Sequence, residues 1–305
     1  ERWLGRPGKT VELTEGLTDA LSKMFSLNQL SGLIFIRGLS LAEIGRIEEA
    51  VAALKYGIDL CEKFGGAVHL GRLYNTLGYC FNEVHAPHEA LKWNLKSEEI
   101  ARKLMEQYPM GGPIAAEIVA QANVNLMENL FDQGKTEEVW TRMKSFEEES
   151  KSSDYYRSRD RWEARLDCLT SLILLQRGNM DEAEARITKN LEISRREHTK
   201  KIEGRFLRLL GEMKMKRNES DKAISSMGDA ILILKEVGNP RQLWQAHASL
   251  ASAYDQLKHL SEAREQWGAA AEIIQKTAKG LSDRKLREGF LNAKPIQGIL
   301  ANAGS

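Results

Sequence analysis

Apolar residues recur along the chain at the three- and four-residue spacing of helices that bury one face. Residues 28–44 carry five such positions, which are Leu30, Leu33, Ile34, Leu41 and Ile44. The dipeptide Gly45-Arg46 interrupts this stripe, and residues 47–64 then carry a second stripe of the same period. This pattern predicts two helices joined by a tight turn, and similar pairs of stripes follow along the rest of the chain.

Three positions recur within these pairs: a small residue, a second one twelve residues later, and a third seven residues further on. The clearest copies are Gly38, Ala50 and Gly57; Gly78, Ala90 and Ser97; Gly211, Ala223 and Ala230; and Ala251, Ala263 and Ala270. Looser copies, with larger residues at some positions, are Met127, Val139 and Phe146 and Ser171, Ala183 and Asn190. Two helices approach closely only where their side chains are small, so the pattern predicts a stack of tightly crossed helix pairs.

We therefore predict an all-α fold, a right-handed superhelical solenoid of antiparallel helix pairs that forms one domain over residues 1–305. The expected parts are a half repeat at 1–27, repeats at about 28–66, 67–108, 114–153, 155–198, 200–239 and 241–279, and a capping helix at 281–301. In the cap, Ser282 is expected to begin the helix and Pro295 to end it.

Two stretches depart from the regular spacing. QYPMGGP at 107–113 has two prolines and two glycines, which predicts an enlarged loop. The charged stretch at 144–161 is expected to be a solvated helix end and linker. Residues 5–13 match the turn and helix start at 45–54, so we expect the chain to open halfway through a repeat, as a fragment of a longer protein.

The turn inside each pair has its own signature, five residues before the central position. The residues there are Gly5, Gly45, His85, Gly134, Gly178, Asn218 and Lys258. Most are types that tolerate a positive φ, which predicts a left-handed residue after each first helix. An acidic residue precedes the central position in five repeats, namely Glu49, Glu89, Glu138, Glu182 and Glu262. Such carboxylates suit the positive end of a helix dipole and are weak candidates for function.

Charge and composition narrow the range of functions. The 44 basic and 43 acidic residues give a net charge of +1, which provides no field to collect nucleic acid or anionic lipid. The three cysteines are odd in number and far apart, which predicts a reducing compartment and a cytoplasmic protein without a disulfide framework. No apolar run approaches the roughly 20 residues that span a bilayer.

Catalytic and metal-binding motifs are missing from the sequence. His85 and His88 flank a turn, but no further ligands complete a metal site around them, so we interpret them as turn residues. No Ser–His–Asp order, P-loop or dinucleotide fingerprint occurs. The locally basic stretch at 195–210 is interrupted by Glu197 and Glu203, which favours a solvated face over a nucleic-acid patch. We predict a non-enzymatic protein without a cofactor or metal.

The repeat resembles the tetratricopeptide repeat (TPR), in the longer form of about forty residues that bacterial regulators contain. LGYCFNEVHAPHEALKWNL, LGEMKMKRNESDKAISSM and LASAYDQLKHLSEAREQW match its Leu-Gly/Ala, aromatic and Ala positions best. The segments GNPRQLWQAHASLASAYDQL at 238–257 and GLSDRKLREGFLNAKPIQGIL at 280–300 are similar to the closing segments of bacterial multidomain signalling proteins. In those proteins a cyclase or kinase domain and an ATPase precede the repeats, and LuxR-type regulators with repeat arrays are similar too.

The resemblance implies that the first helix of each pair lines a concave, partner-binding groove. The inward positions that we select as candidates are Arg72, Asn75, Tyr79, Asn82, Gln121, Asn125, Glu128, Phe131, Arg165, Arg205, Arg208, Gln245 and Asp255. Amide and guanidinium groups can bind a peptide backbone or carboxylates, and the aromatic rings offer apolar contact. The family's clamp for a C-terminal carboxylate is matched in part by Asn75, Asn125 and Arg165, but Leu169 replaces a basic residue. The alternative is that these polar side chains simply face water.

The leading hypothesis is a scaffold or regulatory module that binds a protein or peptide, which can be another domain of the same parent chain. The first alternative is a sensor for a small molecule or short peptide, with an apolar pocket among Cys168, Leu172, Leu175 and Met215. The second alternative is homo-oligomerisation through an end of the solenoid. Nucleic-acid and membrane partners are not expected.

Overall fold

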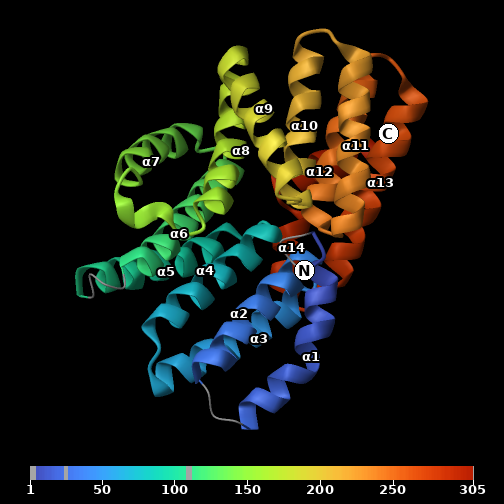
Figure 1. The fold of residues 1–305 in the computed structure, drawn as a ribbon. Coiled ribbons are helices and arrows are strands. Elements are labelled where there is room, and N and C mark those ends of the chain that lie inside the picture. Colours follow the sequence, from blue (N-terminus) through green and yellow to red (C-terminus); the bar gives the residue numbers. More distant parts are fainter. Residues whose placement is uncertain (1–4, 24–26, 108–111, 305) are drawn as a thin grey trace. The chain divides into compact units, whose positions relative to one another are not determined.

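In the computed structural model, which describes residues 5–23, 27–107 and 112–304, every regular element of these ranges is a helix (Figure 1). The helices are α1 (Pro7–Lys23), α2 (Leu27–Glu43), α3 (Ile47–Phe64), α4 (Ala67–Glu83), α5 (Pro87–Gln107), α6 (Gly112–Asp132), α7 (Thr136–Glu149), the 3₁₀ helix η3 (Ser153–Tyr156), α8 (Arg159–Arg177), α9 (Met180–Arg196), α10 (Lys200–Lys216), α11 (Ser220–Val237), α12 (Pro240–Gln256), α13 (Leu260–Lys279), α14 (Arg284–Leu291) and α15 (Lys294–Gly304). The predicted all-α class and the antiparallel helix pairs are confirmed.

The described residues form two compact units. The N-terminal unit holds those of 9–42 and 46–163, and the C-terminal unit holds those of 5–8, 43–45 and 164–304. Within the N-terminal unit, α3 packs on α4 and α5 on α6; within the C-terminal unit, α9 packs on α10 and α11 on α12. Successive pairs therefore stack on their neighbours, as a solenoid requires. That all six repeats form one domain stays a prediction.

The small residues lie where helices cross. Ala50, Ala90 and Ala223 have no exposed surface. A Cβ atom on Gly211 would lie 2.5 Å from Met227 Cγ and 3.0 Å from the carbonyl oxygen of Ala223. These separations are below van der Waals contact, so the crossing of α10 and α11 has no room for a larger side chain. The predicted close packing at the recurring small positions is confirmed.

All seven predicted turn residues adopt a positive φ. The values range from 48° at His85 to 81° at Gly178. After each of the six first helices, the following amide donates a hydrogen bond to the carbonyl five residues earlier, as Arg46 does to Leu41 and His259 to Tyr254, both at 2.9 Å. This is the Schellman arrangement, which closes a helix through one left-handed residue. Its geometry is imposed by the repeat, because His85 and Lys258 adopt it without being glycine.

The stretch at 144–161 contains the end of α7 at Glu149 and many exposed side chains, as expected, but it also contributes aromatic residues to the core. Tyr155 is 2% exposed and Trp162 is 1% exposed. Their rings lie edge-on to Phe146, with centroids 5.7 and 5.6 Å from the Phe146 ring. Phe146 occupies a position that is small in four of the other repeats, and its ring packs with those of Tyr155 and Trp162. Because charged residues predominate in this stretch, its sequence did not reveal the aromatic cluster.

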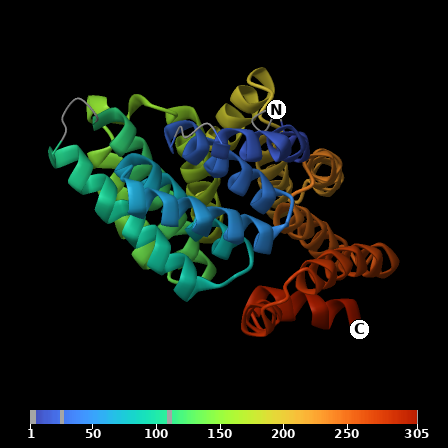
Figure 2. The same ribbon diagram turned by 90° about the horizontal axis from the view of Figure 1, so that it is seen from below.

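The C-terminal cap differs in detail from the expectation. Asp283, and not Ser282, caps α14 by accepting a 2.9 Å hydrogen bond from the Leu286 amide. Pro295 does not end a helix, because α14 has already ended at Leu291 and Pro295 lies in the first turn of α15. Proline is accepted there because a first-turn amide has no intrahelical acceptor. Both short helices follow α13 at the C-terminal end of the chain (Figure 2).

The remaining boundaries agree with the pattern where the structure describes them. α11 ends at Val237, Gly238 is left-handed, and Asn239 caps α12 through its side chain with Pro240 as the first helical residue. The predicted loop at 107–113 falls mainly on residues 108–111, which lie outside the described ranges. The expected half repeat is occupied by α1, which begins at Pro7 after the left-handed Gly5.

Candidate functional site

The candidate residues of the predicted groove are distributed over both units. The N-terminal unit holds those on α4 and α6, which are Arg72, Asn75, Tyr79, Asn82, Gln121, Asn125, Glu128 and Phe131. Tyr79, Asn82 and Asn125 are buried, at 8%, 2% and 0% exposure, and the other five are half-buried. The structure thus places three of the eight inside the protein.

The buried asparagines hold α4, α5 and α6 together. Asn125 donates to the Asn75 carbonyl at 3.1 Å and to the side-chain oxygen of Asn94 at 3.0 Å. Asn82 donates to the Asn125 carbonyl at 3.0 Å and accepts from Asn129 at 3.1 Å. Because an unsatisfied buried amide is costly, these bonds set the register of the three helices. The sequence pattern did not separate such structural amides from groove-facing ones.

Arg72 is also held by its own fold. Its guanidinium lies 2.8 Å from the Glu117 carboxylate of α6, and both side chains are largely buried. Glu117 further accepts hydrogen bonds from Arg157 and Ser158. Burial raises the pKa of Glu117, but Arg72 and the hydrogen bonds outweigh it, so the pKa lies below its ordinary value. We accordingly expect substitution of Arg72 to lower stability as well as any binding.

The C-terminal unit holds the other five candidates, which are Arg165 on α8, Arg205 and Arg208 on α10, and Gln245 and Asp255 on α12. Arg208 is 8% exposed and forms a 2.5 Å ion pair with Glu212. Asp255 accepts a 2.8 Å hydrogen bond from the indole of Trp267. Arg165, Arg205 and Gln245 are half-buried. Their role in a groove stays a prediction.

The residues of the alternative apolar pocket are mainly core residues. Cys168 and Leu175 are buried, at 0% and 3% exposure. Met215 packs against the buried cluster of Met227, Leu250 and Ala253. Leu169, where a clamp would need a basic group, is 2% exposed.

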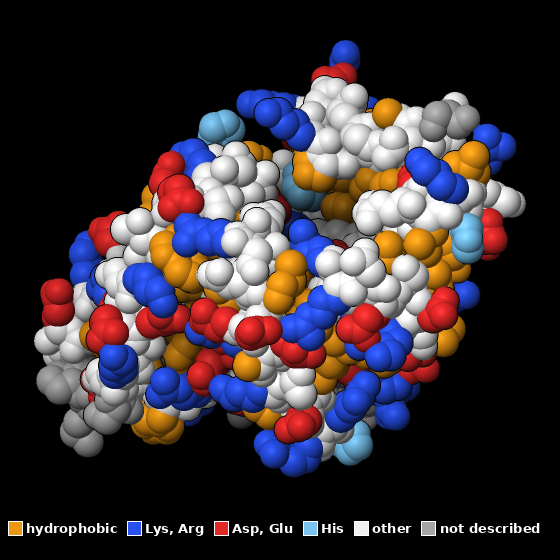
Figure 3. Space-filling model, turned by 90° about the horizontal axis from the view of Figure 1, so that it is seen from above, with side chains coloured by type: hydrophobic (Ala, Val, Ile, Leu, Met, Phe, Trp, Pro, Cys, Tyr) orange, Lys and Arg blue, Asp and Glu red, His pale blue; other side chains and the backbone are white. Residues whose placement is uncertain are grey.

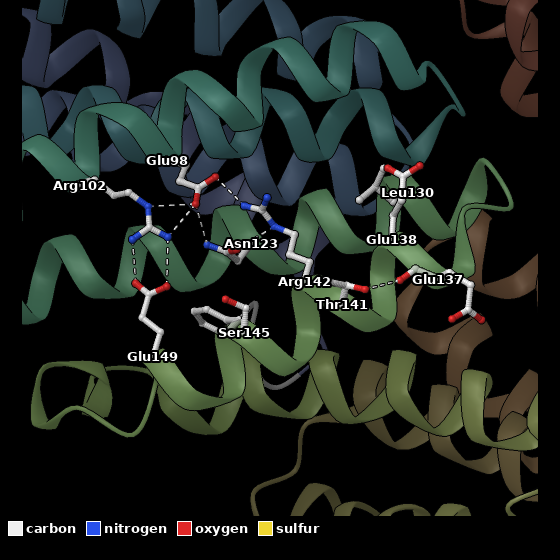
Figure 4. Close-up of a pocket in the computed structure, with 11 residues that line it drawn as sticks. Glu98, Arg102, Asn123, Leu130, Glu137, Glu138, Thr141, Arg142, Ser145 and Glu149 are labelled. Atoms are coloured by element: carbon white, nitrogen blue, oxygen red, sulfur yellow. Dashed lines mark hydrogen bonds and ion pairs between the residues drawn. The ribbon is translucent and has the colours of Figure 1, made fainter.

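A pocket of about 630 Å³ lies between α5, α6 and α7 in the N-terminal unit and is open to solvent (Figure 4). We call it the α5–α7 pocket. Its lining residues are Glu98 and Arg102 of α5, Asn123 and Leu130 of α6, and Glu137, Glu138, Thr141, Arg142, Ser145, Phe146 and Glu149 of α7. None of them belongs to the groove that the sequence predicted.

A network of ion pairs occupies one end of this pocket. Arg102 lies 2.8 Å from both Glu98 and Glu149, and Arg142 lies 2.6 Å from Glu98. Arg142 also donates to Asn123 at 2.9 Å. Figure 4 shows the Arg102 guanidinium between the two carboxylates. Each charged group of the network therefore meets its opposite within hydrogen-bond distance.

The network lowers the pKa values of its two carboxyl groups. Burial raises the pKa of Glu98, but Arg142 and Arg102 outweigh it, and the pKa lies below the ordinary value of 4.5. For Glu149 the raising effect of burial is outweighed by hydrogen bonds from Arg102 and Tyr155, with the same result. Burial and the neighbouring Glu149 raise the pKa of Tyr155. At neutral pH these carboxylates are ionised and Tyr155 is a neutral donor.

Possible metal-ligating and thiol groups were located in the described part of the chain. No group of three or more His, Cys, Asp or Glu residues placed to hold a metal ion occurs there. In the turn between α4 and α5, the imidazole of His85 lies 3.8 Å from the carboxylate of Asp132, the last residue of α6. All three cysteines are free and buried. No helix among the described residues is both long and apolar enough to cross a membrane.

Charges of both signs alternate over the face that Figure 3 shows, and Lys or Arg side chains lie next to Asp or Glu side chains. This mixing agrees with the near-zero net charge. No broad field of one sign therefore covers this face.

Comparison with known proteins identifies the fold. No protein family and no curated protein matches the sequence. Among solved structures, a Rap protein complexed with competence and sporulation factor matches with a TM-score of 0.56 and 13% identity, over 91% of this chain and 80% of that chain. The APC/C hetero-tetramer Cut9–Hcn1 matches with a TM-score of 0.47 and 14% identity, over 94% of this chain and 58% of that one.

At such low identity the likeness to the Rap protein concerns the fold. With the repeat geometry described above, it supports a TPR-like helical repeat.

Proposed function

We propose that this chain is a non-enzymatic repeat module that binds a protein or peptide. The observation that carries the proposal is the open α5–α7 pocket in a stack of TPR-like helix pairs, whose volume of about 630 Å³ suits a short segment of a partner. The similar Rap protein was crystallised with competence and sporulation factor. Solenoids of this kind present extended surfaces built from many repeats, which suits binding better than catalysis.

Selection from a phage library of random peptides on the immobilised full chain tests this proposal. We expect a set of related peptides to be enriched, and soluble protein to compete for them. An unrelated helical protein, immobilised in the same way, is the control. If the enriched peptides are the same on both proteins, or if none is enriched, the chain is not a peptide-binding module.

Two sets of variants then locate the site. Gln121→Ala and Gln245→Ala test the predicted groove, because both residues are half-buried on first helices. Thr141→Ala and Ser145→Ala test the α5–α7 pocket, because both side chains are exposed and line it. Melting curves from circular dichroism confirm that each variant is folded. Weaker binding by only one set assigns the peptide to that surface.

The parent architecture forms a further part of the proposal. The resemblance of the repeats supports a cytoplasmic, bacterial signalling protein in which this module regulates an attached cyclase, kinase, ATPase or DNA-binding domain. Sequencing the gene on both sides of this segment tests it. A neighbouring domain of one of these classes would agree with the proposal, and a gene that encodes the repeats alone would contradict it.

A further inference from the structure

An exposed face of α1 corresponds to a face that is buried in the other repeats. α1 begins after the left-handed Gly5, as α3 begins after the left-handed Gly45, so α1 is the second helix of its pair. Its central position is Thr10, five residues after Gly5. α1 is the first of the described helices, so the described residues contain no first helix that pairs with it. The other repeats show which side chains of α1 and α2 such a helix would meet.

Leu13 stands at a position from which other second helices bond to the first helix of their own pair. This position is three residues after the central one, and its partner lies nineteen residues earlier in the sequence. The pairs are Arg142 with Asn123 at 2.9 Å, Arg186 with Asp167 at 2.6 Å, and Gln266 with His247 at 2.8 Å. Leu13 is 54% exposed. By this equivalence, its side chain faces the place that a first helix takes in the other pairs.

Leu17 stands four residues further along α1, at the third of the recurring small positions. The six equivalent residues are all buried, and they are Gly57, Ser97, Phe146, Asn190, Ala230 and Ala270. The first helix of the pair covers this position. Ser97 of α5 donates to the Gly71 carbonyl of α4 at 2.8 Å, and a Cβ atom on Gly57 of α3 would lie 2.8 Å from a side chain of α2. Leu17, in contrast, is 50% exposed.

Ile36 of α2 faces the same place from the other side. The equivalent residues of the next four repeats are at most 2% exposed, and they are Thr76, Asn125, Leu169 and Leu209. Side chains at this position reach the first helix of the preceding pair. Asn125 of α6 donates to the Asn75 carbonyl of α4 at 3.1 Å, and Ser249 of α12 donates to Glu212 of α10 at 2.6 Å. Ile36 is 42% exposed, and the pair that precedes α2 is that of α1.

The three apolar side chains form one surface, because α1 and α2 lie side by side. The Arg37 guanidinium of α2 donates to the Val11 carbonyl of α1 at 2.9 Å, and both helices belong to the N-terminal unit (Figure 1). We call Leu13, Leu17 and Ile36 the α1–α2 surface. The equivalent place in every other pair holds a helix of 17 to 21 residues. The shape of the surface therefore suits a helix that presents an apolar face.

We propose that the α1–α2 surface binds an amphipathic helix of a partner protein, which takes the place of the first helix beside α1 and packs antiparallel to it. Burial of the three exposed side chains drives the association, as burial of their equivalents stabilises the other pairs. This inference rests on the proposed protein-binding function and names a second surface, outside the α5–α7 pocket, and the shape of its partner.

A peptide with the sequence of α10 tests the inference, because α10 is itself a first helix of this repeat. A lactam bridge between Glu212 and Lys216, four residues apart, keeps the labelled peptide helical. The control peptide keeps these two residues and their bridge and has the other residues in an order without helical apolar spacing. Fluorescence anisotropy with the full chain measures both. We expect the α10 peptide to bind at least about tenfold more tightly than the control.

Two matched double variants locate the bound peptide. Leu13→Ser with Leu17→Ser changes the α1–α2 surface. Leu232→Ser with Leu260→Ser makes the same change at two leucines of the C-terminal unit that are 65% and 67% exposed. We expect the first double variant to weaken the α10 peptide at least about tenfold and the second to leave its affinity unchanged. Melting curves should stay close to that of the unaltered protein, since all four side chains are exposed.

Four outcomes overturn the inference. They are equal affinity for the two peptides, equal weakening by the two double variants, no binding of the α10 peptide, and a dimer of the full chain that Leu13→Ser with Leu17→Ser dissociates. Light scattering measures the last, which would assign the surface to a second copy. Each of these leaves the proposed function standing if the random library has yielded a binding peptide. A failed library selection, in contrast, removes the proposed function itself.

Discussion

At the scale of single residues, the size of a side chain and the sign of its φ decide what each position tolerates. Ala223 is fully buried under the crossing of α10 and α11, whereas Gly228 of α11 has nothing within 4 Å of an added Cβ. Two substitutions of the same kind should therefore have different effects at different places in the repeat.

Ala223→Asp should lower the free energy of unfolding by at least about 3 kcal/mol, because it buries an unpaired carboxylate between crossing helices. Ser225→Asp, on the exposed face of the same helix, is the control and should change it little. Thermal melting by circular dichroism measures both. A melting temperature of Ala223→Asp within a degree or two of the unaltered protein would show that the residue is not at a crossing.

Glycine-to-alanine exchange should have opposite signs at Gly78 and Gly228. A Cβ on Gly78 would lie 2.2 Å from the side-chain oxygen of Asn94, so the amide must move and its hydrogen bond with Asn125 is lost. We expect Gly78→Ala to cost about 1–3 kcal/mol. Gly228→Ala should stabilise by about 0.5–1 kcal/mol, since alanine restricts the unfolded chain.

Urea unfolding of both variants measures this difference. Equal shifts of the two midpoints would contradict the close contact of Gly78 with Asn94.

At the scale of helices, α7 differs from the other second helices. It has 14 residues, whereas α3 and α11 each have 18, and the large Val139 and Phe146 stand at its small positions. The space beside it is filled by the aromatic cluster with Tyr155 and Trp162 and by the ion-pair network of the α5–α7 pocket. The α5–α7 pocket thus lies beside a copy of the repeat that has large residues at its small positions.

The network should make the stability of the N-terminal unit depend on pH in the acid range. The pKa values of Glu98 and Glu149 lie below the ordinary 4.5. Their stabilising contribution is complete above pH 4.5 and is lost as the pH falls through the lowered folded-state values. Urea midpoints at neutral pH and near pH 3 measure this loss. Because Arg102 pairs with both carboxylates, Arg102→Gln should lose less stability between the two conditions than the unaltered protein.

Equal losses in the two proteins would show that Arg102 does not lower these pKa values. Lys103→Gln, which removes an exposed partner of Glu99 on the same helix, is the control and should follow the unaltered protein.

At the scale of the whole molecule, each helix pair is stabilised mainly by its sequence neighbours, as in other repeat arrays. α15 packs on α13, and Phe290, Ile296 and Ile299 of α14 and α15 are buried. We expect Phe290→Ala to loosen the cap and the adjoining α13 without reaching distant pairs.

Hydrogen exchange with mass spectrometry tests this locality. In Phe290→Ala, peptides from α13, α14 and α15 should exchange faster, while peptides from α4, α5 and α6 keep their rates. Leu300→Ala is the milder control at the same end, because Leu300 lies on α15 and is only half-buried. Faster exchange throughout the chain in Phe290→Ala would mean that the array unfolds as one cooperative unit.

The sequence alone determined the features that repeat. The helix period, the small residues at crossings and the left-handed turn residues follow from local rules, and these rules apply again in every copy, so even His85 and Lys258 were placed correctly. Only the tertiary structure decided how the third repeat packs, in which Val139 and Phe146 stand at the small positions. Whether Asn125 faces a groove or a neighbouring helix, and whether Glu138 lies at a pocket, depends on how α5, α6 and α7 pack. That packing is a sum of contacts between residues far apart in the chain, which periodicity does not contain.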